Sequence, residues 1–190
     1  KIYGDFDIEF SSSDIVSNLL LKFDNLQINS LASLWPKIAA NKAREWIDVN
    51  IADGKINHAV AKFKLQHNFL DSSQKTQAIE TNIRINLESS SVKYHTLHDP
   101  IHDIDADVII DNHDIKVDVK HAKHRNSVIE NGFLKISDYH NINELSLDIS
   151  GDFKGKINDF SYILNPYIDK PIQILDKDFN DVKGDASGNF

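Results

Sequence analysis

Cysteine and methionine are both missing from the 190 residues of this chain. The lack of cysteine excludes disulfide bonds, thiolate metal sites, cysteine nucleophiles and iron–sulfur clusters. Because there is no methionine, the sequence does not start at a start codon, and we expect it to be a processed product or an internal piece of a longer protein. The sequence has no run of about 18 apolar residues, so it predicts no membrane-spanning helix. The sequence does not open with a basic segment followed by an apolar one, so no signal peptide is predicted.

Positive charge is also scarce. Lysine and arginine number 21 against 29 aspartates and glutamates, and the formal net charge is −8. Nucleic-acid binding depends on cationic neutralisation of phosphates, and electrostatic docking to anionic lipid heads depends on basic clusters. The charge balance therefore argues against both classes of partner.

The apolar residues that are present favour strands. The chain has 25 isoleucines and only 11 alanines, and β-branched side chains suit a pleated, half-buried surface. Apolar and polar residues alternate strictly in several segments, which gives each segment one dry and one wet face. These segments are 6–10, 59–65, 83–87, 104–110, 115–119 and 145–149. Segments 19–29 and 128–137 are also predicted strands, with a bulge or bend after Phe23 where the apolar phase slips.

Short polar connections between these segments, such as 111–114, predict hairpins. Clean alternation favours an antiparallel meander over a parallel sheet that is buried on both faces. The dry face must then meet either the protein's own core, in a closed sandwich or barrel, or a ligand, in an open and curved sheet. Both alternatives remain open at this point.

Two helical pieces interrupt the predicted strands. The first starts near Ser33, with Pro36 in its first turn, and Ala39, Ala43 and Trp46 share one face. Trp35 and Trp46 are interpreted as packing anchors between this helix and the sheet. The second helix covers 157–165 and stops before Pro166.

Nine histidines raise the question of a metal site. His95, His98 and His102 cluster near Asp99, and His121 lies close to His124 in the sequence. This spacing falls on no helix face, and zinc needs three or four ligands held tetrahedrally, so we interpret them as surface histidines without a metal.

Catalytic motifs are missing as well. Paired carboxylates such as Asp105 and Asp107 fit a solvated strand face better than an acid–base pair, and no nucleophile, phosphate or dinucleotide motif is present. We therefore expect neither an enzyme nor a cofactor.

One block of the sequence resembles a known family. Trp35-Pro36, then Ala43-Arg44-Glu45-Trp46, then Asp53-Gly54 before a strand, resemble the YhdP branch of the AsmA-like proteins. The order of strands and glycines that follows is also similar, through 100–106, 145–151 and 183–188, so the resemblance covers about 31–190.

This resemblance implies a fold and a function. It implies a mainly β segment with two short helices, in which a curved antiparallel meander forms an open groove; a closed β-sandwich is the alternative. The expected organisation is a single β-rich segment of a longer protein. It comprises strands over 1–30, a helix and turn over 31–54, the meander over 55–156, a short helix over 157–166 and the start of the next strand unit over 167–190.

The implied function is lipid transfer. AsmA-like proteins of Gram-negative bacteria are anchored in the inner membrane and span the periplasm. They carry phospholipid or another acyl-chain lipid toward the outer membrane along an apolar groove, which supports outer-membrane integrity. The residues expected to line that groove are Ile83, Ile85, Leu87, Ile104, Ala106, Val108, Ile110, Ile115, Val117, Val119, Leu145, Leu147 and Ile149. The alternative function is a β-sandwich interaction or structural module of a surface or secreted protein.

Overall fold

The computed structural model describes residues 1–10, 14–35, 41–68, 76–93, 99–139, 141, 144, 146–156, 159, 173–174, 177–178 and 185–189. The predicted helix over 157–165 and the lipid-groove candidate Leu145 lie outside these residues, apart from Asp159.

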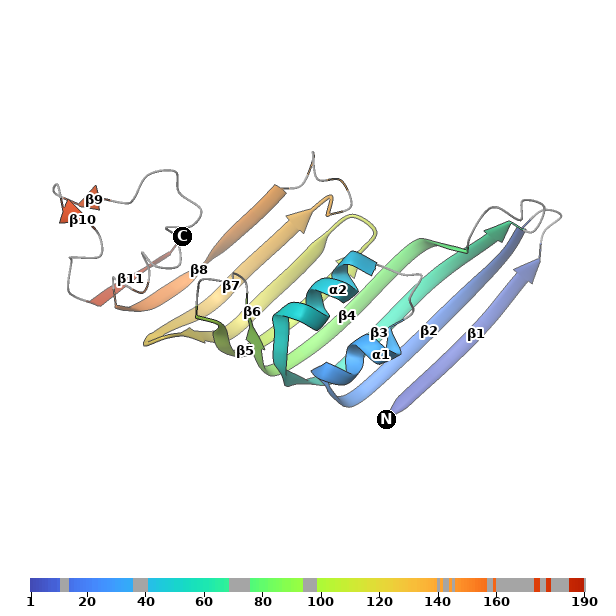
Figure 1. Ribbon diagram of the computed structural model, residues 1–190, viewed down its shortest axis with the longest axis horizontal. Helices are drawn as coiled ribbons and strands as arrows, with labels where there is room; N and C mark the ends of the chain where they lie inside the picture. The colour runs from blue at the N-terminus through green and yellow to red at the C-terminus, as the bar shows by residue number, and fades with distance from the viewer. Residues whose placement is uncertain are drawn as a thin grey trace.

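A single antiparallel sheet makes up most of the fold (Figure 1). Its nine strands follow the order β1-β2-β3-β4-β5-β6-β7-β8-β11, so the first eight neighbours are also consecutive in the chain. The strands are β1 (Ile2–Phe10), β2 (Asp14–Gln27), β3 (Ile51–Asn68), β4 (Gln77–Val92), β5 (Ile101–Asp111), β6 (Ile115–His124), β7 (Ser127–Ser137), β8 (Ser146–Lys156) and β11 (Asp185–Asn189). The short strands β9 (Gln173–Ile174) and β10 (Lys177–Asp178) pair with each other in a separate sheet.

The predicted mainly β, antiparallel architecture is confirmed. Strands β1 and β11 form the two edges of the sheet in the described part of the chain, and the sheet is open and unclosed. The closed β-sandwich that the sequence left as an alternative is therefore wrong for these residues.

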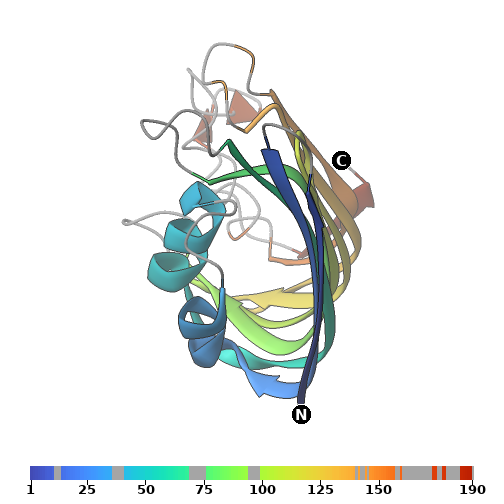
Figure 2. The same ribbon diagram turned by 90° about the vertical axis from the view of Figure 1, so that its right-hand side faces the viewer.

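The sheet is curved, and Figure 2 shows the strands bending around one side. Asn25, Ser89, Asp103 and Asn131 lie inside four different strands and have φ between 49° and 53°. Register shifts accompany three of these four positions, in the pairings of β4 with β5, β5 with β6 and β7 with β8. Bulges bend strands and increase their twist, so this line of irregular residues across the sheet accounts for the bend. The slip predicted after Phe23 corresponds to Asn25.

Three short helical elements lie on the concave side of the sheet (Figure 2). They are the 3₁₀-helix η1 (Ile28–Ser30), α1 (Leu31–Leu34) and α2 (Asn41–Asn50). The predicted helix start at Ser33 is wrong: α1 ends at Leu34, and Trp35 has extended backbone with ψ of 127°. The cause is local, since a residue that precedes proline is pushed out of the helical region. None of the helices in the described ranges has the length and apolar character needed to cross a membrane.

The main core lies where η1 and α1 cover the sheet. Leu31 and Trp35 are buried against a cluster that includes Phe23, Ala59 and Ile85 from three successive strands. The space left among α1, Trp35 and these strands is about 20 Å³, which is room for about one water molecule and far too little for an acyl chain. The helical elements therefore fill the centre of the concave face.

Candidate binding face

Three rows of side chains run across the concave face of the sheet, perpendicular to the strands. Residues directly opposite each other in neighbouring antiparallel strands point to the same face, so the strand register assigns each row. The first row is Ile2, Phe23, Ala59, Ile85, Val108, Val117, Leu134 and Ile149. The second row is Gly4, Leu21, Ala61, Ile83, Ile110, Ile115, Ile136 and Leu147. The third row is Leu26, Ile56, Leu87, Ala106, Val119 and Gly132.

These rows, which we call the apolar face, contain no charged or polar side chain. The first two rows extend from β1 to β8 and the third from β2 to β7, because each strand contributes its alternate residues in register with the next. Most of the residues expected to line a groove fall within them. The exceptions are Ile104, which lies opposite Ser90 beyond a register shift, and Leu145, which is outside the described residues.

Exposure divides the apolar face into a covered centre and two open ends. In the centre, Ile83, Ile85, Leu87, Ala106 and Ile110 are buried, as is Ile104 beside them. Towards β8, Val108, Ile115, Val117 and Val119 are half-buried. At β8 itself, Leu147 is 46% exposed and Ile149 is 51% exposed.

The residues that cover the centre come from the protein itself. Leu34 and Trp35 lie over Ile83 and Ile85 of β4, so these two predicted groove residues belong to the packed core. The predicted groove residues in β6 and β8 that the structure describes remain accessible. The sequence could not separate the two groups, because both show the same alternation.

The convex face is polar and is held by ion pairs between strands. The Lys120 ammonium lies 2.6 Å from Asp107, and the Asn86 amide donates a 2.6 Å hydrogen bond to the same carboxylate. These two hydrogen bonds, from Lys120 first, lower the pKa of Asp107. Asp114 is placed similarly, with Lys135 at 3.0 Å, and the Lys135 hydrogen bond lowers the pKa of Asp114. These paired charges lie on the side of the sheet opposite the apolar face.

The histidines form no metal centre in the part of the chain that is described. His95 and His98 lie outside that part, and no three His, Asp or Glu side chains gather there in a way that could hold a metal ion. His102 is exposed, and its Nδ1 lies 3.1 Å from Ser91 Oγ.

A buried polar cluster joins the β6–β7 turn to Asp159. Ser127 Oγ donates a 2.9 Å hydrogen bond to Asp159, the Asn126 N–H donates to the same oxygen at 3.3 Å, and His124 is fully buried beside them. Burial lowers the pKa of His124. Serine, histidine and aspartate are the residue types of a catalytic triad, but this serine is 1% exposed and donates to the carboxylate. The cluster therefore links Asp159 to the β6–β7 turn by hydrogen bonds and does not present a nucleophile.

Sequence reasoning missed two features of this structure. It did not single out the buried polar cluster, because Ser127 and Asp159 are far apart in the chain and carry no motif. It recognised the alternation in β1 but did not include Ile2, Phe6, Ile8 and Phe10 among binding candidates; all four are 42–76% exposed.

Comparison of the chain with protein-family models, curated proteins and solved structures gave no match.

Proposed function

We propose that the chain is a segment of an AsmA-like, YhdP-type bridge protein that carries phospholipid between the inner and outer membranes of a Gram-negative bacterium. In this proposal the segment works in the periplasm, as part of a protein that is anchored in the inner membrane. Its role is to bind acyl chains and it catalyses no reaction. The Trp35–Gly54 block is the sequence feature that suggests this family.

The observation that carries the proposal is the apolar face. Beyond the covered centre, the open sheet leaves neighbouring apolar side chains of β6–β8 accessible side by side, which is more contiguous apolar surface than scattered single side chains provide. An acyl chain placed along a row gains about 0.8 kcal/mol for each CH₂ group that it buries. The charged head group can stay in water at the rim, so no specific polar contact is needed.

The covered centre limits where a lipid can lie. Because the space beneath α1 and Trp35 is filled, we place the acyl chains over the β5–β8 end of the apolar face, against Val117, Leu134 and Ile149. These side chains are half-buried or exposed, so a ligand there adds contacts without displacing core residues.

Lipid loading of an Ile149→Asp variant tests this proposal. Ile149 is 51% exposed, so the substitution leaves the fold intact while placing a charge among the acyl contacts. We expect the affinity for a fluorescent phospholipid to fall roughly ten-fold, since a buried isoleucine contributes about 1.5–3 kcal/mol when it is fully covered. Binding is measured by fluorescence titration, and lipid that co-purifies with the wild-type protein is measured by mass spectrometry.

The neighbouring residue provides a matched control. Ser150 is also exposed but belongs to the opposite face of β8, so Ser150→Asp adds the same charge away from the acyl chains and should leave loading unchanged. A wild-type protein that is free of lipid and takes up none of the fluorescent phospholipid would refute the proposal. Equal losses in the two variants would place the lipid elsewhere.

A further inference from the structure

The buried polar cluster at the β6–β7 turn joins three parts of the chain that are far apart in the sequence. His124 ends β6 and lies opposite Ser127, the first residue of β7. Ser127 Oγ donates a hydrogen bond of 2.9 Å to Asp159, which follows β8. In the turn, the Arg125 guanidinium lies 2.7 Å from the carboxylate of Asp99, which precedes β5, and 3.9 Å from the second oxygen of Asp159. The turn is therefore held from both sides.

The turn places an arginine where its backbone favours glycine. Arg125 is the first of the two turn residues and has φ of 55°, a region that glycine adopts without strain. Glycine could not make the contacts of the guanidinium with Asp99 and Asp159. These contacts give a physical reason for the strained residue, and they show that the charges around the turn belong to its structure.

The ionisable groups of this cluster lie inside the protein. His124 is fully buried and Asp159 is 5% exposed. Among the ionisable side chains of the described residues, only Tyr139 is buried besides these two, and burial raises the pKa of Tyr139 above its ordinary value of 10.0. His124 is therefore the buried group in this part of the chain that ordinarily changes its charge near neutral pH.

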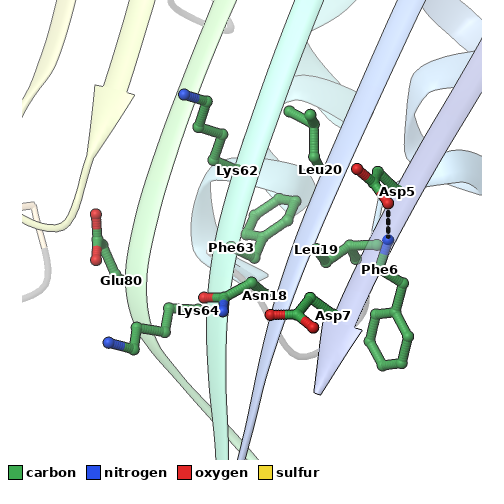
Figure 3. Close-up of a pocket in the computed structure, with 10 residues that line it drawn as sticks. All are labelled: Asp5, Phe6, Asp7, Asn18, Leu19, Leu20, Lys62, Phe63, Lys64 and Glu80. Carbon is green, nitrogen blue, oxygen red and sulfur yellow. Dashed lines mark hydrogen bonds between the residues drawn. The ribbon is translucent and has the colours of Figure 1, made fainter. Parts of the chain in front are cut away.

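Charged groups on the open surface are under no such constraint. A surface hollow of about 240 Å³ is lined by Asp5, Asp7, Lys62, Lys64 and Glu80 together with apolar residues (Figure 3). All five charged residues are exposed except Lys64, which is half-buried. Water can solvate a charge there, so a change of protonation requires little change in structure. A charge that forms on His124 has to be accommodated within the fold, which is costly.

Three charged residues act on the His124 ring, and each belongs to one of the joined parts. Burial, and after it the Arg125 guanidinium, lower the pKa of His124. The backbone of Asp99 and the carboxylates of Asp159 and Asp99 act in the opposite direction, but the net effect is a lowered pKa. The closed cluster therefore favours the neutral imidazole.

Other charged groups nearby face away from the ring. Lys123 and Lys154 both lie opposite Val128 of β7 and are exposed on the other face of the sheet. On that face Lys123 lies 3.0 Å from Asp103, and His102 of β5 is the register partner of Lys123. The strands on either side thus add no further charge to the His124 side of the sheet.

We propose that the buried polar cluster is a pH-sensitive contact, which keeps Asp159 bound to the β6–β7 turn while His124 is neutral and releases Asp159 when His124 is protonated. Protonation creates a second cation beside Arg125 in a site that excludes water, and both effects oppose the closed cluster. Opening the cluster exposes the imidazolium to water and removes both costs. This inference does not depend on lipid binding.

The direction of the pH response follows from the two states of His124. In the open cluster the ring meets water and has its ordinary pKa of 6.5, whereas in the closed cluster the pKa is lower. The open state therefore binds the proton more readily. The closed state has its full stability above pH 6.5 and loses it as the pH falls below 6.5 towards the lower pKa of the closed cluster. Carboxylates ordinarily protonate at about pH 4, so a response at mildly acidic pH belongs to histidine.

Hydrogen exchange at the turn tests the proposal. The Asn126 N–H donates a hydrogen bond of 3.3 Å to Asp159, so its protection factor, measured by NMR on the full chain and corrected for the intrinsic exchange rate at each pH, reports closure of the cluster. We expect this protection factor to fall by up to about ten-fold between pH 7.5 and pH 5.5, because opening is coupled to the uptake of one proton. The amide of Ile85, in the centre of the sheet, should keep its protection.

Two histidine variants identify the group that responds. His124→Gln places a neutral side chain of similar size in the cluster, so the protection of Asn126 should be the same at both pH values. His121→Gln is the matched control, because His121 lies in the same strand in register with Asp105 and Glu130, outside the cluster. This control should keep the pH response of the wild-type protein.

A direct NMR titration of the His124 ring in the wild-type protein completes the test. A pKa of 6.5 or above in the folded protein would overturn the proposal, even if His124→Gln failed to fold. The same conclusion would follow if the protection of Asn126 did not change with pH, if wild type and His124→Gln responded equally, or if Ile85 lost its protection together with Asn126. Lipid loading is measured separately at neutral pH, so failure here leaves the lipid proposal standing, and the reverse also holds.

Discussion

Individual residues fix how closely the strands approach each other. Gly155 in β8 lies against the β6–β7 turn, where a Cβ atom on Gly155 would be 2.6 Å from Ser127 Cα and would also collide with Ser127 Oγ. The absence of a side chain at this position is therefore what allows Ser127 to reach Asp159. Gly54 has a similar role opposite Ser90, and its φ of 128° adds a conformational requirement that only glycine meets without strain.

We expect Gly155→Ala to destabilise the protein by about 1–3 kcal/mol, because the added methyl group overpacks a site whose nearest atoms include backbone. The measurement is the shift in the urea unfolding midpoint. Gly4→Ala is the matched control in another strand, since its Cβ would lie 3.5 Å from Leu21 Cδ2, an ordinary contact, and its effect should stay within about 0.5 kcal/mol. Equal effects of the two substitutions would contradict this account of Gly155.

At the scale of elements, the helical cover depends on one tryptophan far more than on the other. Trp35 follows α1 directly, and its backbone N–H donates a 2.9 Å hydrogen bond to the Leu31 carbonyl oxygen. Its side chain is 6% exposed. Trp46 in α2 is 49% exposed, so the prediction that both tryptophans anchor the helix to the sheet is correct for Trp35 and wrong for Trp46. Trp35 has extended backbone with ψ of 127°, as expected for a residue that precedes proline in the sequence.

Replacing each tryptophan should show this asymmetry. Trp35→Ala removes a buried side chain between α1 and β2–β4, and we expect a loss of about 3–5 kcal/mol in unfolding free energy. Trp46→Ala removes a half-exposed side chain and should cost less than about 1 kcal/mol. Urea denaturation measures both, and a larger loss for Trp46→Ala would mean that α2 rather than α1 holds the cover in place.

The elements also show what sequence can and cannot predict. Alternation predicted most strands, and it placed residues such as Ile85 and Ile149 on the same dry face. It could do so because a period of two is a local property of the sequence. It could not predict that Ile85 is covered while Ile149 is open, because cover depends on where η1 and α1 fold back over distant strands. The closed sandwich remained an alternative for the same reason, since closure is a property of the sheet edges.

For the molecule as a whole, the apolar face has one closed and two open regions. The helical elements close it over β2–β4, whereas β1 and β8 expose apolar side chains at either end. The open region at β8 is the one to which we assign the acyl chains.

Cysteine accessibility can map this division directly, because the chain has no cysteine of its own. In Ile149→Cys the thiol lies at the open end and should react with a water-soluble maleimide at the rate of an exposed thiol. In Ile85→Cys the thiol lies beneath Trp35. It should react at least roughly 100-fold more slowly, since labelling requires local opening of the helical cover. Adding phospholipid should slow the labelling of Ile149→Cys. It should leave the labelling rate of Ser150→Cys, on the opposite face of the same strand, unchanged. Rates are followed by mass spectrometry. Fast labelling of Ile85→Cys in a folded protein would show that the cover opens readily and that the centre is available to ligands after all.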